Sequence, residues 1–325
     1  MRVYVSRDFP RKGIDMLLDQ GIETTVWEQD RPQTREELIR NVKGYDALFC
    51  ASTDKIDSHF LRESKHLKMI SQFAAGYDNI DLKEATRQGI IVANTPDVMR
   101  DATADIAFTL MLAVSRKICY MHKKIIRGEW DYFRPKANLG RELSKATIGI
   151  VGMGSIGMEM AKRCKAAYEM EILYTGHRQN EFAEKLYNAR KVSLEELCQK
   201  SDVISVHCPL TDETRGMFDM SWFKKMKPSA IFINTARGTI HREEDLIEAL
   251  QKGYIWGAGL DVTDPEPMDK DNPLLEMENV AVVPHIGSST IQARDAMSRL
   301  AAENILDFVA GKKIKNLLNP EVLEG

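Results

Sequence analysis

A glycine-rich turn between an apolar run and a helical pattern, within residues 146–174, constrains this chain more than any other feature. Thr147 to Met153 is rich in branched apolar residues and contains the start of the turn Gly152-Met-Gly154-Ser-Ile-Gly157. Gly152 would make the turn, Gly154 would let the backbone approach a pyrophosphate, and Gly157 would let the following helix lie close to the sheet. Because a strand precedes the turn and an amphipathic helix and second strand follow it, the pattern predicts dinucleotide binding rather than only a tight β–α turn.

Composition bounds the class of protein. A chain of 325 residues exceeds one ordinary domain, so we expect two lobes. The net charge of −3 provides no basic field, and we therefore expect neither a nucleic-acid nor a membrane partner. The most apolar stretch, Ile106 to Val114, is too short to span a bilayer. Five cysteines without a CxxC pair, and no signal peptide, predict a cytoplasmic protein with reduced thiols and no metal site.

Residues 1 to about 97 alternate apolar runs with helical patterns. Glycines at 21, 44 and 89 stand where helices should end. Such alternation predicts a mostly parallel sheet with helices on both faces. The predicted strands are Arg2–Ser6, Thr24–Trp27, Ala47–Ala51, Lys68–Phe73 and Ile90–Ala93. This lobe has no glycine phosphate loop of its own.

The second lobe begins with one long predicted helix, from about Thr103 to Arg127. Its broad apolar stripe would be buried either between lobes or in a subunit interface, and the pattern does not decide between them. A polar connection over 128–145 follows, and a helix over 291–310 would return the chain to the first lobe. Six strands, the number in the doubly wound dinucleotide fold, are predicted: Thr147–Met153, Glu171–Thr175, Val203–Cys208, Ala230–Thr235, Trp256–Val262 and Val280–His285.

The residues after the second of these strands bear on the choice of cofactor. In NAD-binding folds an acidic residue there binds the adenosine ribose, but this strand runs into Gly176, His177 and Arg178. Glu169 and Glu171 precede its apolar core and should lie at its other end. Arg178 offers a planar fork suited to a 2′-phosphate, although a solvated surface arginine is the alternative. The sequence thus favours NADP, with NAD possible.

Three titratable residues lie at or soon after predicted strand ends, where ligands of open α/β sheets bind. Arg237 follows one strand, Glu266 lies in a loop after the next, and His285 ends the last. Taken singly, each has an ordinary structural interpretation: a turn arginine in a salt bridge, an exposed carboxylate, or a histidine at the edge of a core. Together they form a consistent anion clamp, orienting carboxylate and acid.

These residues lie in segments that resemble the D-isomer-specific 2-hydroxyacid dehydrogenase family over nearly the whole chain. The sequence looks most like its glyoxylate/hydroxypyruvate reductase branch, which includes 2-ketogluconate reductases. The matching segments are GIVGMGSIG, HCPLTDETRGM, FINTARG, WGAGLDVTDPEP, VPHIGSST, AAGYDNID and NTPDV. In that branch a Ser-Arg pair more often stands where this chain has Gly176-His177.

The resemblance implies two doubly wound parallel-sheet lobes. One is a discontinuous, flavodoxin-like substrate-binding domain of residues 1–98 and 290–325, and the other a Rossmann dinucleotide-binding domain of residues 99–289. It implies catalytic roles for Arg237, Glu266 and His285, and substrate contacts at Ala75, Gly76, Arg237, His285 and Ser288. The expected dinucleotide contacts are Thr103, Gly152, Gly154, Ser155, Ile156, Gly157, Gly176, His177, Arg178, Cys208, Pro209, Thr214, Thr235, Ala236 and Asp261.

The activity that the resemblance implies is NADPH-dependent reduction of a small 2-oxo acid, glyoxylate or hydroxypyruvate, by a homodimer built around the dinucleotide domains. Arg237 would hold the substrate carboxylate, and His285 would protonate the developing alkoxide with Glu266 on its other ring nitrogen. The alternatives are 2-keto-D-gluconate or 3-phosphohydroxypyruvate as substrate, NADH as reductant, and a corepressor-like protein that only binds the dinucleotide. A formate dehydrogenase is disfavoured because that branch pairs its histidine with Gln.

Overall fold

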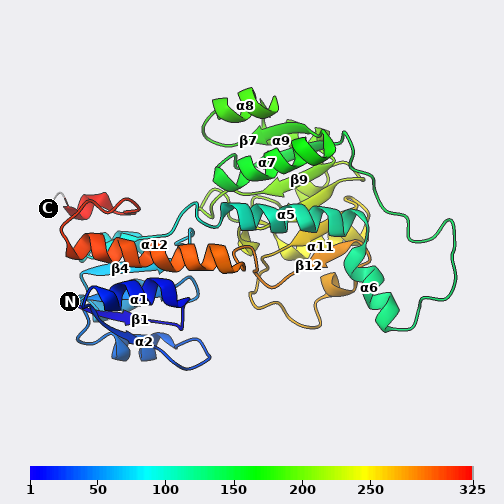
Figure 1. Cartoon of the computed structure of the whole chain (residues 1–325). Coiled ribbons are helices and arrows are strands. Elements are labelled where there is room, and N and C mark those ends of the chain that lie inside the picture. Colours follow the sequence, from blue (N-terminus) through cyan, green and yellow to red (C-terminus); the bar gives the residue numbers. More distant parts are fainter. Residues whose placement is uncertain (324–325) are drawn as a thin grey trace. The chain divides into compact units, whose positions relative to one another are not determined.

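The computed structural model describes residues 1–323, which fold as two compact units. Unit 1 comprises Met1–Met99 together with the segment from Ser289 onward, and unit 2 comprises Arg100–Ser288. Each unit contains one sheet whose strands all run parallel, with helices packed on both faces (Figure 1). The predicted fold class, two doubly wound parallel-sheet lobes, is confirmed.

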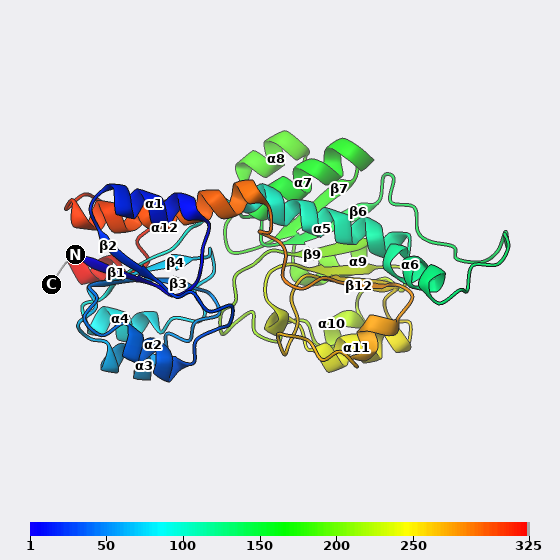
Figure 2. The ribbon, with the colours of Figure 1, turned by 60° about the horizontal axis from the view of Figure 1, so that its bottom comes forward.

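The sheet of unit 1 has five strands in the order β2-β1-β3-β4-β5, which is the flavodoxin-like order. Helices α1 and α12 cover one face of this sheet and α2, α3 and α4 the other (Figure 2). The elements are β1 Arg2–Val5, α1 Arg11–Asp19, β2 Glu23–Val26, α2 Arg35–Asn41, β3 Ala47–Ala51, α3 Ser58–Glu63, β4 Met69–Phe73, α4 Leu82–Arg87, β5 Ile91–Ala93 and α12 Ile291–Val309, with a 3₁₀ turn at Pro320–Leu323.

The returning helix α12 is part of the unit 1 core. It packs against α1 so closely that a Cβ on Gly13 would lie 2.1 Å from the Ser298 carbonyl oxygen. The helix stops predicted at Gly21, Gly44 and Gly89 are confirmed, since all three glycines have positive φ. Hydrogen bonds between segments distant in sequence, such as Ser71 Oγ to the Ala301 carbonyl at 2.8 Å, tie the last helix to the sheet.

The sheet of unit 2 has seven strands in the order β12-β11-β10-β9-β6-β7-β8. Counted from β6, the order β8-β7-β6-β9-β10-β11 is the 3-2-1-4-5-6 of the dinucleotide fold, with β12 added beyond it. The strands are β6 Thr147–Val151, β7 Glu171–Thr175, β8 Arg190–Lys191, β9 Val203–Val206, β10 Ile231–Asn234, β11 Gly257–Leu260 and β12 Val280–Val282.

The prediction of six strands in this lobe was therefore wrong by one. The missed strand, β8, has only two residues, and both are basic and exposed. It lies at the edge of the sheet, where it pairs with β7 alone. An edge strand this short buries no apolar face, so no periodic pattern marks it in the sequence.

Two groups of helices sandwich the unit 2 sheet (Figures 1 and 2). Residues of α5, α7 and α8 form the core on one face, and residues of α9, α10 and α11 form the core on the other. The helices are α5 Arg100–Ser115, α6 Ile118–Ile126, α7 Ser155–Tyr168, α8 Glu181–Tyr187, α9 Leu194–Lys200, α10 Met220–Phe223 and α11 Glu243–Gln251, with 3₁₀ turns at Gly238–Ile240 and Pro273–Glu276.

The single long helix predicted over 103–127 is two helices. Lys117, between α5 and α6, has a left-handed backbone (φ 56°), which ends α5 without a glycine or proline to signal it. The apolar stripe was predicted to be buried between the lobes or in a subunit interface. In α5 it is buried in neither way, because Leu110, Met111 and Val114 lie in the core of unit 2 itself. Helix α6 instead lies beside β12, and Lys117 forms an ion pair with Glu278 at 2.7 Å.

No helix within residues 1–323 is both long enough and apolar enough to cross a membrane.

Candidate active site

The glycines of the β6–α7 turn have different surroundings. Gly152 has φ 97°, and a Cβ there would lie 2.7 Å from the Cys208 backbone nitrogen. A Cβ on Gly157 would lie 2.3 Å from the Gly152 carbonyl oxygen, so this glycine lets α7 approach β6. A Cβ on Gly154 would meet nothing within 4 Å. Protein packing thus explains Gly152 and Gly157 but leaves the space at Gly154 open.

The residues at this edge of the sheet fit a dinucleotide. Gly154 is the N-cap of α7 and gives it no side-chain cap, so the N–H groups of the first turn, including those of Ser155 and Ile156, are available to a phosphate. After β10, the Thr235 hydroxyl oxygen is buried without a hydrogen-bond partner among residues 1–323. A bound polar ligand would fill the space at Gly154. It would also accept hydrogen bonds from the helix N–H groups and pair with the Thr235 hydroxyl.

Gly176, His177 and Arg178 follow the carboxyl end of β7, and all three residues are exposed. Glu171 pairs with Thr147 at the start of β6, which confirms that it lies at the opposite end of the strand. However, the loop after β9 brings a carboxylate to this edge: Glu213 Oε2 lies 3.7 Å from His177 Nε2. The sequence pattern places Glu169 and Glu171 at the other end of β7 but does not reveal Glu213, because Glu213 comes from the loop of another strand.

The loop that follows β9 contains three of the predicted dinucleotide contacts. Cys208 is half-buried, and burial raises the pKa of its thiol to about 11, so it stays protonated at neutral pH. The Thr214 hydroxyl donates to the Pro209 carbonyl oxygen at 2.8 Å and accepts from the Thr211 N–H at 2.8 Å. Thr214 thereby fixes the shape of the loop that also carries Glu213.

His285 and Glu266 form a close pair in unit 2. The His285 Nδ1–Glu266 Oε1 distance is 2.5 Å, and both side chains are 42% exposed. The strand predicted to end at His285 stops at Val282. His285 lies three residues further on, in a left-handed conformation (φ 51°), and its N–H donates to the Asp261 carbonyl oxygen at 2.9 Å. A turn, rather than the strand, therefore aims the imidazole.

The carboxylate of Asp261 holds that turn. It is buried and accepts from the N–H groups of Ile286 at 2.6 Å and Gly287 at 2.8 Å. Burial raises its pKa above the ordinary value, against the lowering effect of these hydrogen bonds. A Cβ on Gly287 would lie 2.8 Å from the carboxylate and 3.3 Å from Thr103 of α5, so the turn fits between strand end and helix.

The pKa of Glu266 lies below its ordinary value. Burial raises it, but the hydrogen bond and charge of His285 and the charge of Arg237 lower it more. The carboxylate therefore remains ionised below the pH at which a free glutamate is half protonated, and it loses its charge only as the pH falls through the lowered pKa. Nδ1 of His285 is therefore bound to an ionised carboxylate at neutral pH, and Nε2 is not bound by Glu266.

Arg237 follows β10 on a tightly held turn. Its guanidinium Nη1 donates to the Ala236 carbonyl oxygen at 2.7 Å. A Cβ on the next residue, Gly238, would lie 1.9 Å from the Thr263 carbonyl oxygen. The turn carrying Arg237 is thus packed directly against the segment between Asp261 and Glu266, and unit 2 brings the predicted guanidinium, carboxylate and imidazole to the same edge of its sheet.

Two predicted site residues, Ala75 and Gly76, belong to unit 1. They follow β4, and their carbonyl oxygens accept from Asn94 Nδ2 at 2.7 Å and Gln72 Nε2 at 2.9 Å. Their carbonyls are therefore committed to holding the loop, while their N–H groups have no partner among the described residues. Ser288 is the last residue of unit 2.

Two further functional candidates were missed by sequence reasoning. Glu213 lies within the motif HCPLTDETRGM, but no spacing rule places it beside His177. Asn234, the last residue of β10, donates from Nδ2 to the Arg237 carbonyl oxygen at 2.9 Å. An asparagine at the end of a buried strand and three residues before a catalytic candidate was the available signal.

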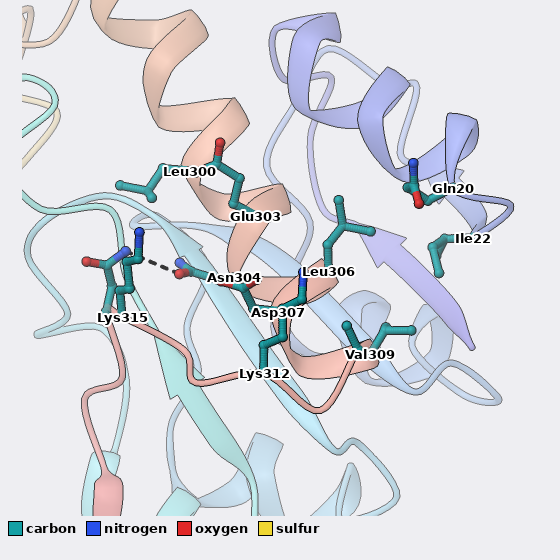
Figure 3. A pocket seen from close by; sticks show the side chains of 12 residues that line it. Gln20, Ile22, Leu300, Glu303, Asn304, Leu306, Asp307, Val309, Lys312 and Lys315 are labelled. Atoms are coloured by element: carbon teal, nitrogen blue, oxygen red, sulfur yellow. Dashed lines mark hydrogen bonds between the residues drawn. The ribbon is translucent and has the colours of Figure 1, made fainter.

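A pocket of about 530 Å³ lies elsewhere in unit 1, beside the C-terminal half of α12. It is lined by Asn304, Asp307 and Lys315 among others (Figure 3), and none of its lining residues is a predicted site residue. Within residues 1–323, no group of three or more His, Cys, Asp or Glu side chains could hold a metal ion.

Comparison with known proteins gives consistent matches. The sequence model "D-isomer specific 2-hydroxyacid dehydrogenase, NAD binding domain" matches residues 108–287. A glyoxylate reductase of Thermococcus litoralis is 43% identical over 326 residues, which cover 99% of this chain and 98% of the relative. A solved structure of a Thermus thermophilus protein superposes with a TM-score of 0.90 at 38% identity, covering 98% of this chain and 100% of its own. An acyclic imino acid reductase solved with NADPH and D-Arg superposes with a TM-score of 0.86 at 27% identity, covering 98% and 100%.

The two glycines with different surroundings give a paired test of the dinucleotide site. Gly154→Ala should leave the thermal unfolding midpoint near that of the wild type, because its Cβ meets no protein atom, but should weaken dinucleotide binding by obstructing the phosphate. Gly157→Ala should destabilise the fold by about 1–3 kcal/mol through overpacking. Calorimetric unfolding and titration with NADPH measure both. Unchanged NADPH affinity in Gly154→Ala would contradict the assigned phosphate position.

Proposed function

The chain belongs to the D-isomer-specific 2-hydroxyacid dehydrogenase family, and from this premise we propose that it is an NADPH-dependent reductase of glyoxylate and hydroxypyruvate, forming glycolate and D-glycerate. It is an NAD(P)-dependent dehydrogenase acting on a small 2-oxo acid. The observation that supports the proposed reduction is the His285–Glu266 pair at 2.5 Å, which lies in the dinucleotide-binding unit together with Arg237. Five unpaired cysteines support a reducing, cytoplasmic location.

The two units have separate roles in this proposal. Unit 2 is the dinucleotide-binding domain, since the matched NAD-binding sequence model and the glycine turn both fall within it. Unit 1 is the substrate-binding domain, and the loop at Ala75 and Gly76 supplies N–H groups for the substrate carboxylate. Oriented backbone N–H groups suit an anion because they donate without adding a full charge to be desolvated.

The proposed mechanism assigns each charged group one task. The reduced dinucleotide, when bound, supplies a hydride to the carbonyl carbon. Arg237 holds the substrate carboxylate and polarises the carbonyl with charge-assisted hydrogen bonds. His285, protonated and with Nδ1 fixed by Glu266, donates the proton on Nε2 to the developing alkoxide. The ionised Glu266 stabilises the imidazolium before transfer and keeps the ring orientation afterwards.

The preference for NADPH rests on the charges beyond β7. Arg178 is exposed and forms no ion pair within residues 1–323, so its fork remains available to a 2′-phosphate. Glu213 opposes this, but it lies beside His177, which offsets its charge when protonated. The related imino acid reductase was solved with NADPH, which supports a 2′-phosphate in this fold. NADH remains the alternative reductant.

The proposed homodimer uses an arm that we define as residues 118–139. Seven of the fifteen large hydrophobic side chains exposed within residues 1–323 lie in it, including Ile126 at 72%, Trp130 at 77% and Phe133 at 86%. The apolar stripe of α5 cannot serve, because it is buried in unit 2. A soluble chain rarely exposes so many large apolar groups in one segment unless they meet a partner.

Substrate assays test the proposed activity directly. The wild type should oxidise NADPH with glyoxylate and with hydroxypyruvate, and less efficiently with 2-keto-D-gluconate. His285→Ala should lower kcat by about 10²- to 10⁴-fold, the usual contribution of a positioned general acid. His59→Ala, which removes an exposed histidine of unit 1, is the control and should keep wild-type turnover. No turnover of any 2-oxo acid by the wild type, with dinucleotide bound, would favour the corepressor-like alternative instead.

Two charge changes test the cofactor assignment in opposite directions. Arg178→Gln should lower the ratio of kcat/KM for NADPH to that for NADH by about 10- to 100-fold, because a hydrogen bond to a charged group is lost. Glu213→Gln should raise the ratio, since it removes the carboxylate beside His177. Asp212→Asn changes the same charge on the neighbouring residue and should have little effect. A ratio unmoved by Arg178→Gln would place the 2′-phosphate away from this residue.

The arm is tested by the state of association in solution. The double variant Ile126→Asp and Phe133→Asp should sediment as a monomer at micromolar concentration, where the wild type sediments as a dimer, because two charges would be buried in the interface. Phe182→Asp, on the exposed face of α8, is the control and should remain dimeric. A double variant that stays dimeric would remove the arm from the interface.

A further inference from the structure

The turn that carries Arg237 is held by a single buried carboxamide. Asn234, the last residue of β10, is fully buried, and its side chain binds the backbone of Ala236 and of Arg237. Its Oδ1 accepts from the Ala236 N–H at 3.0 Å, and its Nδ2 donates to the Arg237 carbonyl oxygen at 2.9 Å. Because one partner is a backbone donor and the other a backbone acceptor, the carboxamide has only one orientation that satisfies both.

That orientation determines the state of a second buried residue. Nδ2 of Asn234 also lies 3.0 Å from Nδ1 of His241, and Nδ2 can only donate. Nδ1 of His241 must therefore be the unprotonated acceptor, which leaves the ring neutral with its proton on Nε2. Burial lowers the pKa of this imidazole to about 4, which is consistent with a neutral ring at physiological pH.

His241 belongs to the packing beneath the turn rather than to its exposed edge. The ring is 2% exposed and meets Phe232 of β10 edge-on, with centroids 5.8 Å apart. The backbone N–H of His241 donates to the Gly238 carbonyl oxygen at 3.1 Å. Nε2 has no hydrogen-bond partner among the described residues. The hydrogen bond to Asn234 is thus the only polar contact that its side chain makes within residues 1–323.

The turn is also fixed from its other side. Gly238 packs on the backbone of Thr263, two residues beyond Asp261 in the segment that leads to Glu266. A shift of the Arg237 backbone would therefore change its distance from that segment as well as its direction. Asn234 on one side and Thr263 on the other therefore both restrict the backbone at Arg237.

We propose that Asn234 and His241 are positioning residues for Arg237, with His241 supplying the acceptor that keeps the Asn234 carboxamide turned toward the Arg237 carbonyl. This inference rests on the proposed role of Arg237 as the clamp on the substrate carboxylate. Neither residue touches the substrate; both act through the backbone of the turn. Loss of the acceptor would leave a buried N–H of Asn234 unpaired, and the carboxamide could regain a partner only by leaving the turn.

A pair of substitutions at His241 separates positioning from mere packing. His241→Leu replaces the imidazole by an apolar side chain of similar size, which removes the acceptor, and should raise the KM for glyoxylate by about 10- to 100-fold, as expected for a misplacement of about 1 Å. The KM for NADPH should rise by a smaller factor, because the same turn carries the expected dinucleotide contacts Thr235 and Ala236, whereas Arg237 acts on the substrate. His241→Asn places an oxygen where Nδ1 lies and should restore the KM for glyoxylate to within a few-fold of the wild type.

The outcomes that overturn the proposal are distinct. Equal KM values for glyoxylate in the Leu and Asn variants, or a parallel rise in both KM values with a lower unfolding midpoint, would assign His241 to packing alone. Independently of any variant, ¹⁵N NMR of the wild type should show His241 neutral with the proton on Nε2; a proton on Nδ1 would refute the proposal. Arg237→Lys should impair glyoxylate use, and unchanged kinetics there would contradict the proposed function itself rather than this inference.

Discussion

The hydrogen bond between Glu266 and His285 is the interaction on which the chemistry of this protein depends. It joins two loops that leave the neighbouring strands β11 and β12. The distance is 2.5 Å, and the bond fixes the imidazole through Nδ1 while Glu266 leaves Nε2 unbound. Glu266 gains from the pair as well, since its pKa is held below the ordinary value and it stays ionised across the neutral range. The contact thus orients the imidazole and keeps the carboxylate ionised.

The pair keeps its geometry because the backbone segments that carry it are closely packed and hydrogen-bonded. Asp261 binds the N–H groups of Ile286 and Gly287 and so fixes the turn that aims His285. Gly238 rests on Thr263 where no side chain could fit, which sets the Arg237 turn against the same segment. Parallel strands bring their carboxyl ends to one edge of the sheet. The close backbone contacts then set the distances between the side chains of the site.

Much of this could be predicted from the sequence, and the failures have physical causes. The glycine turn was predictable because Gly152 and Gly157 each make a contact that no other residue permits. The break at Lys117 was not, because a left-handed residue that is neither glycine nor asparagine leaves no local signal and the apolar stripe continues past it. Strand β8 buries too little to show a pattern. Glu213 was overlooked because only the tertiary fold brings it to 3.7 Å from His177.

The central claim is that His285, backed by Glu266, and Arg237 act on the same carbonyl compound. A crystal structure of the protein with NADP⁺ and oxamate, an unreactive mimic of a 2-oxo acid, tests it most directly. The account predicts His285 Nε2 and the Arg237 guanidinium each within hydrogen-bond distance of oxamate, about 2.6–3.2 Å, with Glu266 still bound to Nδ1. Oxamate bound away from these groups, or an imidazole turned from it while the dinucleotide is in place, would contradict the account.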